Sequence, residues 1–154
     1  MRHLIFLVSA VLLASGCSSS VNVHVLGQAE MNKGGNAAVV KLYQLTAEGN
    51  FKNTPLSAFW RDDEGALASE LVTPPRKITV YPAHTKTISL AVEDNTTYLG
   101  VAANLRTPDR DKWRSLVPLK EMGDRVSVTI DRNTVKVEFE ERTIPQLGTG
   151  AGRR

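Results

Sequence analysis

Cysteine and histidine are scarce in this sequence, and their scarcity excludes several kinds of functional site. The single cysteine, Cys17, rules out a disulfide bond within one chain. The three histidines do not combine with it in a zinc-ligand spacing, and there is no glycine-rich phosphate loop or nucleophile elbow. The sequence therefore predicts no enzyme, no catalytic residues, no metal site and no cofactor.

Runs of basic residues are also absent, which argues against a nucleic-acid partner. The 19 Lys and Arg residues are nearly balanced by 16 Asp and Glu residues, for a formal net charge of +3. The basic residues are dispersed and do not alternate with aromatic residues, as they do on many nucleic-acid-binding surfaces. We expect no nucleic acid among the partners.

The sequence has no hydrophobic run long enough to cross a membrane as a helix, which takes about 20 residues. The longest run, residues 4–14, has the length of a signal-peptide core and follows the polar residues Arg2 and His3. Small residues lead from this run directly to Cys17. We expect residues 1–16 to be a signal peptide.

The position of Cys17 immediately after this signal is typical of a lipidation site. The segment is similar to the lipobox of bacterial lipoproteins, although Ala14 stands where leucine is commonest. An ordinary signal peptide followed by a stray cysteine is the alternative. We predict that Cys17 carries acyl chains, in which each buried methylene contributes about 0.8 kcal/mol to membrane anchoring. Ser18, in place of an aspartate, favours the outer membrane, and residues 17–20 form a short tether.

Alternating apolar residues predict β-strands along most of the remaining chain, and the clearest pair flanks a turn at residues 131–133. Eight short strands indicate a mainly β fold, a two-sheet antiparallel β-sandwich over residues 21–142. The glycine-rich residues 143–154 are expected to form a disordered tail. The predicted strands cover residues 21–25, 38–45, 78–81, 85–92, 98–105, 113–119, 126–130 and 135–139.

A short helical insertion is predicted at about residues 54–71. The Thr-Pro pair at 54–55 is typical of an N-cap followed by proline at the first helical position. The acidic residues 62–64 lack the spacing of a calcium loop, and an acidic residue at the start of a second helix explains them through the helix dipole. We expect Phe59 and Trp60 to hold these helices on a sheet.

The connection at residues 27–36 separates the first two predicted strands. Its Gly34 and Gly35 tolerate positive φ, which is typical of a loop. Apolar Ala29 and Met31 could dock in a pocket of a partner, or the segment could be a plain surface connection. The residues themselves leave both interpretations open.

Several motifs in a fixed order carry a resemblance to a known family. They are Asn32, VVKLYQL at residues 39–45, Phe51 and Phe59, YLGVAANLR at residues 98–106, and Trp113 with Arg114. With the lipobox, this order resembles the outer-membrane lipoprotein family of the type VI secretion system, TssJ (also called VasD), over residues 21–139. The chain departs from the family in its short, glycine-rich loop at residues 27–36 and at Ala83, where the family often has glycine.

The resemblance implies a structural protein. Family members are transthyretin-like β-sandwiches with an added helical element, held in the periplasmic leaflet of the bacterial outer membrane. They bind the periplasmic C-terminal region of the inner-membrane protein TssM, within a complex that also holds TssL. The family contacts TssM through the loop between the first two strands, which here implies the partner-binding residues Gln28, Glu30, Met31, Asn32 and Lys33.

Two other functions stay open on the sequence. A periplasm-facing lipoprotein could bind a small hydrophobic ligand or another envelope protein, and the ligand would require an apolar pocket. An enzyme or enzyme inhibitor would instead require a cluster of polar residues with shifted pKa values.

Overall fold

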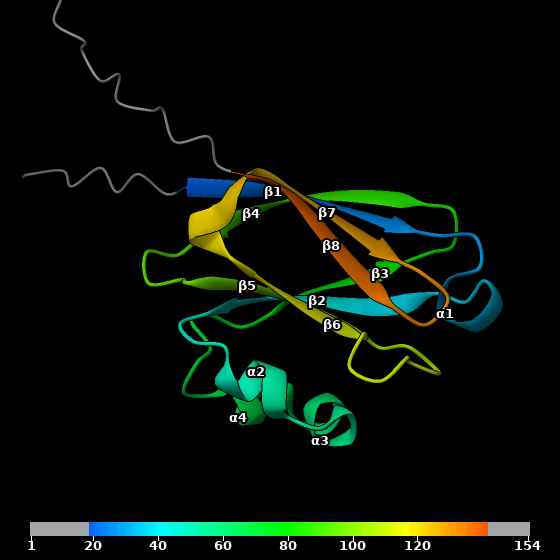
Figure 1. Cartoon of the computed structure of the whole chain (residues 1–154), viewed down its shortest axis with the longest axis horizontal. Coiled ribbons are helices and arrows are strands. Elements are labelled where there is room, and N and C mark those ends of the chain that lie inside the picture. The colour runs from blue at the N-terminus through cyan, green and yellow to red at the C-terminus, as the bar shows by residue number, and fades with distance from the viewer. Residues whose placement is uncertain (1–18, 142–154) are drawn as a thin grey trace, which may run out of the picture.

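The computed structural model describes residues 19–141, which form two four-stranded β-sheets packed face to face (Figure 1). The expected signal peptide, Cys17 and the expected tail lie outside these residues. All eight strands lie inside them, so a chain that begins at Ser18 contains the complete sandwich. No helix within residues 19–141 is long and apolar enough to cross a membrane.

The two sheets have different strand orders, and each combines strands that are far apart in the sequence. The first sheet has the order β4 (Thr85–Val92), β1 (Ser19–Gly27), β7 (Met122–Ile130) and β8 (Val135–Glu141). The second sheet has the order β3 (Arg76–Val80), β2 (Ala38–Leu45), β5 (Tyr98–Ala103) and β6 (Arg114–Pro118). A short 3-10 helix, Leu119–Glu121, joins β6 to β7.

The predicted sandwich is confirmed, with one correction to its antiparallel pattern. β1 pairs with β7 in parallel, while every other strand pair is antiparallel. β1 and β2 lie in different sheets, so residues 28–37 connect the two layers rather than close a hairpin. The first strand can therefore pair with a late strand that runs in its own direction.

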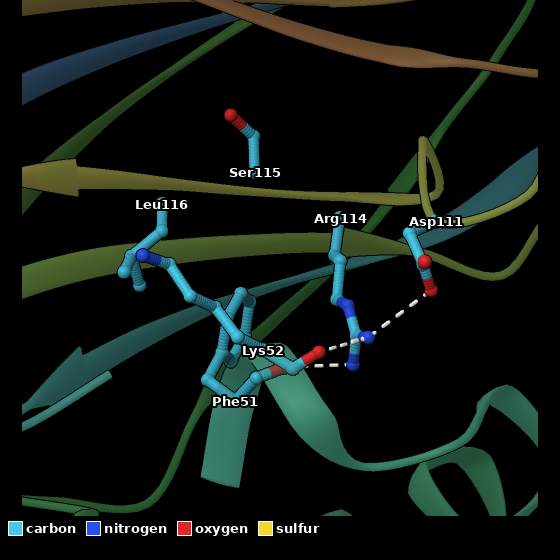
Figure 2. Close-up of a pocket in the computed structure, with 6 residues that line it drawn as sticks. All are labelled: Phe51, Lys52, Asp111, Arg114, Ser115 and Leu116. Carbon is cyan, nitrogen blue, oxygen red and sulfur yellow. Dashed lines mark hydrogen bonds and ion pairs between the residues drawn. The ribbon is translucent and has the colours of Figure 1, made fainter. Parts of the chain in front are cut away.

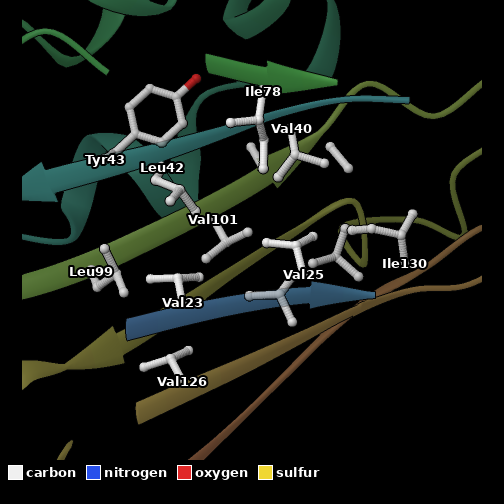
Figure 3. Close-up of a cluster of buried hydrophobic side chains, with 14 of the residues drawn as sticks. Val23, Val25, Val40, Leu42, Tyr43, Ile78, Leu99, Val101, Val126 and Ile130 are labelled. Atoms are coloured by element: carbon white, nitrogen blue, oxygen red, sulfur yellow. The ribbon is translucent and has the colours of Figure 1, made fainter. Parts of the chain in front are cut away.

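The core lies between the two sheets, where the alternating residues of each strand meet (Figure 3). Val23 and Val25 of β1 face the layer that holds Leu99 and Val101 of β5, and each of these four side chains is at most 1% exposed. Complete burial of one such side chain contributes about 1.5–3 kcal/mol. Tyr43 of β2 points the other way, toward the helices.

Three short helices cover the outer face of the second sheet (Figure 1). They are α2 (Gly49–Asn53), α3 (Leu56–Arg61) and α4 (Asp63–Leu67). The predicted insertion at 54–71 missed α2, whose Gly49 and Asn50 are weak helix formers. The carboxylate of Glu70 stabilises its first turn by accepting a 2.8 Å hydrogen bond from the Asn50 amide.

The ends of these helices differ from the sequence-based expectation. Thr54 does not cap α3, because its hydroxyl donates a 2.7 Å hydrogen bond to the Asn50 carbonyl and so closes α2. Pro55 occupies the N-cap position of α3 instead. Asp62 caps α4 by accepting a 2.9 Å hydrogen bond from the Gly65 amide, as the acidic cluster suggested.

An aromatic cluster joins the helices to the second sheet. Phe59 of α3 is fully buried, and its ring centroid lies 5.5 Å from that of Tyr43 and 4.9 Å from that of Trp113, both in edge-to-face geometry. Gly100 leaves room for Phe51, since a Cβ at position 100 would lie 2.8 Å from a Phe51 ring carbon. The apolar central strand β5 is thus covered on both faces, as its sequence predicted.

Candidate protein-interaction surface

Four loops converge at the end of the sandwich where β1 stops, around the turn labelled α1 (Figure 1). We call this surface the loop end; it comprises residues 27–37, 81–84, 104–113 and 131–134. Backbone hydrogen bonds connect the four loops to one another. They run from Gly27 N to His84 O (2.9 Å), from Gln28 N to Ile130 O (2.9 Å), from Lys33 N to Arg132 O (2.8 Å) and from Asp109 N to Asn133 O (2.9 Å).

The loop at residues 27–37 folds into a left-handed turn at α1 (Met31–Gly34). Asn32 and Lys33 have φ values of 48° and 60°, and Gly34 and Gly35 follow with φ values of 85° and 83°. The two glycines adopt the positive φ that the sequence suggested, at no steric cost. The segment is therefore a defined turn rather than an unstructured connection.

Asn32 holds this turn to the rest of the molecule. Its side chain is 3% exposed, and its Nδ2 donates a 2.7 Å hydrogen bond to the Ala37 carbonyl. The Asn32 Oδ1 accepts a 2.7 Å hydrogen bond from the backbone amide of Arg106. One amide group therefore satisfies backbone atoms of two loops.

The structure divides the five predicted partner-binding residues into two groups. Met31 is fully buried in the core and Asn32 is nearly so, because the left-handed turn directs both side chains into the end of the sandwich. This burial corrects the expectation that these two side chains contact a partner directly. Gln28, Glu30 and Lys33 are exposed, and contact by these three stays a prediction.

An exposed aromatic residue, which is not among the predicted partner-binding residues, lies beside this turn. Tyr81 is 57% exposed, and its ring centroid lies 6.3 Å from that of His84 across the β3–β4 turn. Leu26, at the end of β1, is the other large hydrophobic side chain exposed in the described part of the chain. In the sequence, the Tyr81-Pro82 pair at the end of the strand predicted at 78–81 is the local signal for an aromatic residue at a turn.

A second candidate site is the cleft between α2 and β6 (Figure 2). Arg114 Nη1 donates hydrogen bonds of 2.7 Å to the carbonyls of both Phe51 and Thr54, and its Nη2 donates to the Lys52 carbonyl. Figure 2 shows Arg114 reaching from β6 to the last turn of α2, with Asp111 beside it. Because its donors are occupied by the helix, we interpret Arg114 as a structural residue that ends α2.

The pKa values of Asp63 and Tyr43 are shifted in a closed cluster beneath the helices. Lys41 Nζ lies 2.9 and 2.7 Å from the two carboxylate oxygens of Asp63, and the hydroxyl of Tyr43 donates a 2.5 Å hydrogen bond to Asp63. Burial raises the pKa of Asp63, but the hydrogen bonds from Lys41 and Tyr43 outweigh it and hold this pKa below its ordinary value. Burial, with this same bond, raises the pKa of Tyr43 far above its ordinary value. The three groups satisfy one another, which is typical of a structural cluster.

The histidines and carboxylates of residues 19–141 do not form a metal site. Within this range no group of three or more potential metal-ligating side chains converges. The ring of His24 lies 2.9 Å from the hydroxyl of Thr87 on the outer face of the first sheet, and that of His84 lies 2.7 Å from the Pro82 carbonyl.

Comparison with protein families identifies the group to which these features belong. The family described as "Type VI secretion lipoprotein, VasD, EvfM, TssJ" matches residues 19–142. The chain belongs to this family. No curated protein matches the sequence at a significant level.

Solved structures of type VI secretion proteins share the fold of this type VI secretion lipoprotein. A chain of a type VI membrane complex superposes with a TM-score of 0.72 at 19% identity, over 79% of this chain and 98% of that one. TssJ1 from Pseudomonas aeruginosa superposes with a TM-score of 0.71 at 16% identity, over 82% and 99%. A chain from the structure described as the TssM C-terminal domain from EAEC superposes with a TM-score of 0.67 at 16% identity, over 77% and 97%.

The motifs that carry the family resemblance lie mainly around the helices, away from the loop end. Tyr43, Phe51, Phe59 and Trp113 pack edge to face, and the guanidinium of Arg114 lies 4.5 Å from the Trp113 ring centroid. Gln44 of the VVKLYQL motif is buried. Its side chain donates a hydrogen bond to the Ala91 carbonyl and accepts one from the Glu93 amide, which connects β2 to the end of β4. These type VI lipoprotein motifs thus specify the scaffold. Of the motif residues, Asn32, residues 104–106 and Trp113 lie within the loop end.

Proposed function

We propose that this type VI secretion lipoprotein tethers a TssM-like inner-membrane protein to the outer membrane, in a complex that also holds a TssL-like protein. Acyl chains on Cys17 hold the domain in the periplasmic leaflet, and the loop end binds the periplasmic C-terminal region of the partner. The observation that carries the proposal is the position of the loop end. Backbone hydrogen bonds join its loops, and it lies at the opposite end of β1 from Ser19.

The strand β1 connects the two ends on which this role depends. It begins at Ser19, two residues after Cys17, and its nine residues extend about 30 Å to the loop end. The expected tether is therefore shorter than residues 17–20, because Ser19 and Ser20 already belong to the strand. Only Ser18 separates Cys17 from the first strand, and the loop end lies at the opposite end of that strand.

The pairing of β1 suits a protein that transmits force. β1 lies between β4 and β7, and its antiparallel register with β4 runs from Ser19 opposite Val92 to Leu26 opposite Thr85. Because ladder hydrogen bonds of an antiparallel pair are perpendicular to the strands, a pull along β1 loads many of them together. The proposed mechanism is mechanical rather than chemical.

The loop end also offers more contact area than one loop. A standard interface buries about 800 Å² on each partner, which residues 27–36 cannot supply alone. Exposed Tyr81 and Leu26 border this loop and add apolar surface. Tyr and Arg are enriched among the residues that dominate binding energy, so Tyr81 is the expected apolar anchor of the contact.

Calorimetry of the chain from Ser18 to Arg154 with the cognate TssM periplasmic C-terminal region tests this proposal. The variant changes Gln28, Glu30 and Lys33 to serine and keeps the buried Met31 and Asn32, so the turn itself is preserved. The matched control changes three exposed residues near the start of β1, namely Glu93, Asn95 and Lys120, to serine.

Micromolar or tighter binding that the loop variant abolishes and the control retains would support the tether and its site. Binding that survives in both variants would support the function and contradict the site. Absence of binding by the unaltered chain would contradict the proposed function.

A further inference from the structure

A cluster of basic side chains occupies one half of the loop end. Lys33, Arg106, Arg110 and Arg132 are all exposed, and they come from three different loops. None of the four makes an ion pair with another residue of the described chain. We call them the basic cluster.

The tertiary structure brings these four residues together through their backbones. The amide of Lys33 donates to the carbonyl of Arg132, and the amide of Arg106 donates to the side chain of Asn32, next to Lys33. The amide of Asp109, next to Arg110, donates to the carbonyl of Asn133, next to Arg132. The positions are therefore held as neighbours.

Three acidic residues of the same loops form ion pairs with basic residues outside the basic cluster. Asp109 pairs with Lys112 at 2.9 Å and Asp111 pairs with Arg114 at 3.2 Å. Asp131 lies 3.7 Å from Lys136 on β8. In the described loops this leaves Glu30 as the one acidic side chain at the loop end outside an ion pair.

Two members of the basic cluster stand where the fold alone would favour glycine. Lys33 has a φ of 60° and Arg110 has a φ of 50°. A side chain in this left-handed region costs about 1–2 kcal/mol relative to the right-handed one. Strained backbone positions occur often at functional sites. Lysine and arginine at these two positions therefore indicate a role in binding rather than in stability of the fold.

We propose that the basic cluster binds an acidic segment, rich in Asp and Glu, of the protein partner that docks at the loop end. This inference rests on the proposed function and adds the chemistry of the partner. Arginine pairs with carboxylates through two parallel hydrogen bonds, which gives such a contact geometry as well as charge. A protein segment fits better than a lipid surface, because the cluster lies at the end of β1 away from Ser19 and the anchor.

The test compares the unaltered Ser18–Arg154 chain with three variants. The cluster variant carries Lys33→Gln, Arg106→Gln, Arg110→Gln and Arg132→Gln. The control variant carries the same charge change at exposed residues of other surfaces, through Arg61→Gln, Arg76→Gln, Lys77→Gln and Lys120→Gln. A third variant, Lys33→Gly with Arg110→Gly, removes two charges at positions where glycine relieves the backbone, so its fold is expected to be retained.

Each form is titrated with the TssM C-terminal region and, separately, with poly-L-glutamate. For the unaltered chain we expect both affinities to fall between about 0.1 M and 1 M NaCl, because the screening length shortens from about 10 Å to about 3 Å. We expect the cluster variant to bind about tenfold or more weakly at low salt, mainly through slower association, and the control variant to bind as the unaltered chain does. The glycine variant should also weaken binding without loss of thermal stability.

The two probes separate failure of the proposed function from failure of this inference. If the TssM region does not bind, the proposed function is wrong. If poly-L-glutamate nevertheless binds and the cluster variant loses this binding, the preference of the cluster for acidic segments is supported. If the cluster variant binds both probes as tightly as the control variant, the inference is wrong whatever TssM does. Vesicles of phosphatidylglycerol are titrated as a third probe. If the cluster variant loses binding to these vesicles alone, the inference is wrong and the cluster is assigned to a lipid surface.

Discussion

Asn32 and Arg106 are separated by 74 positions in the sequence, yet the Arg106 amide donates a 2.7 Å hydrogen bond to Asn32 Oδ1. The same side chain donates from Nδ2 to the Ala37 carbonyl. Asn32, which the family resemblance implied to be a partner contact, thus connects two loops of the protein itself. It shapes the loop end from the inside, while its neighbour Lys33 faces solvent.

Replacement of Asn32 by alanine is expected to lower the free energy of unfolding by about 1–3 kcal/mol. The change leaves the Arg106 amide and the Ala37 carbonyl without their partner, and alanine tolerates the φ of 48° less well than asparagine. Urea unfolding followed by circular dichroism measures the loss. The control, Asn95→Ala at an exposed turn, should change stability by less than about 0.5 kcal/mol. Equal losses in the two variants would contradict this role of Asn32.

Replacement of Ala83 by glycine is expected to leave stability unchanged or to raise it by up to about 1 kcal/mol. Ala83 has a φ of 57°, a backbone conformation that glycine adopts without steric cost. Relief of the backbone offsets the extra freedom that glycine gives the unfolded chain. Thermal and urea unfolding compare this variant with Ala58→Gly in α3, which should lose about 1 kcal/mol. A similar loss at both positions would argue against strain at Ala83.

Stability is expected to fall at acid pH through Asp63. The pKa of Asp63 in the folded protein lies below its ordinary value of 3.8, so its contribution is complete above that value and is lost as pH falls through the folded pKa. Asp63→Asn should remove this part of the pH dependence and cost about 3 kcal/mol at neutral pH, because Lys41 is left without its counter-charge. Urea unfolding at several pH values measures both effects. Asp124→Asn, at an exposed position, should leave the pH dependence intact; loss of the acid slope in this control would reject the assignment to Asp63.

Replacement of Arg114 by lysine is expected to destabilise the protein by about 1–3 kcal/mol although the charge is kept. The planar guanidinium bonds the carbonyls of Phe51, Lys52 and Thr54, and the single ammonium of lysine cannot reproduce this arrangement. Hydrogen exchange should show faster opening of α2, and urea unfolding gives the overall loss. Arg125→Lys, on the exposed side of β7, should cost less than about 0.5 kcal/mol. Unchanged protection of α2 in Arg114→Lys would contradict the structural role.

The scaffold and the loop end differ in how far the sequence could predict them. The motif around Tyr43 and the pair Trp113 and Arg114 carried the family resemblance because these residues pack against one another, and such packing restricts which residues fit. The basic cluster could not be predicted in this way. Lys33 was a predicted partner contact and Arg106 ends a family motif, but no run or spacing marks positions 33, 106, 110 and 132 as one group.

Local patterns by themselves determined the strands at 38–45 and 85–92, the hairpin of β7 and β8, and the positive φ of Gly34 and Gly35. Each depends on the direction of neighbouring side chains or the freedom of one backbone. Only the tertiary structure decided the parallel pairing of β1 with β7, the formation of α2, the burial of Met31 and Asn32, and the assembly of the loop end. These features depend on contacts between residues far apart in the chain. The energies of such contacts cannot be inferred from any local segment of the sequence.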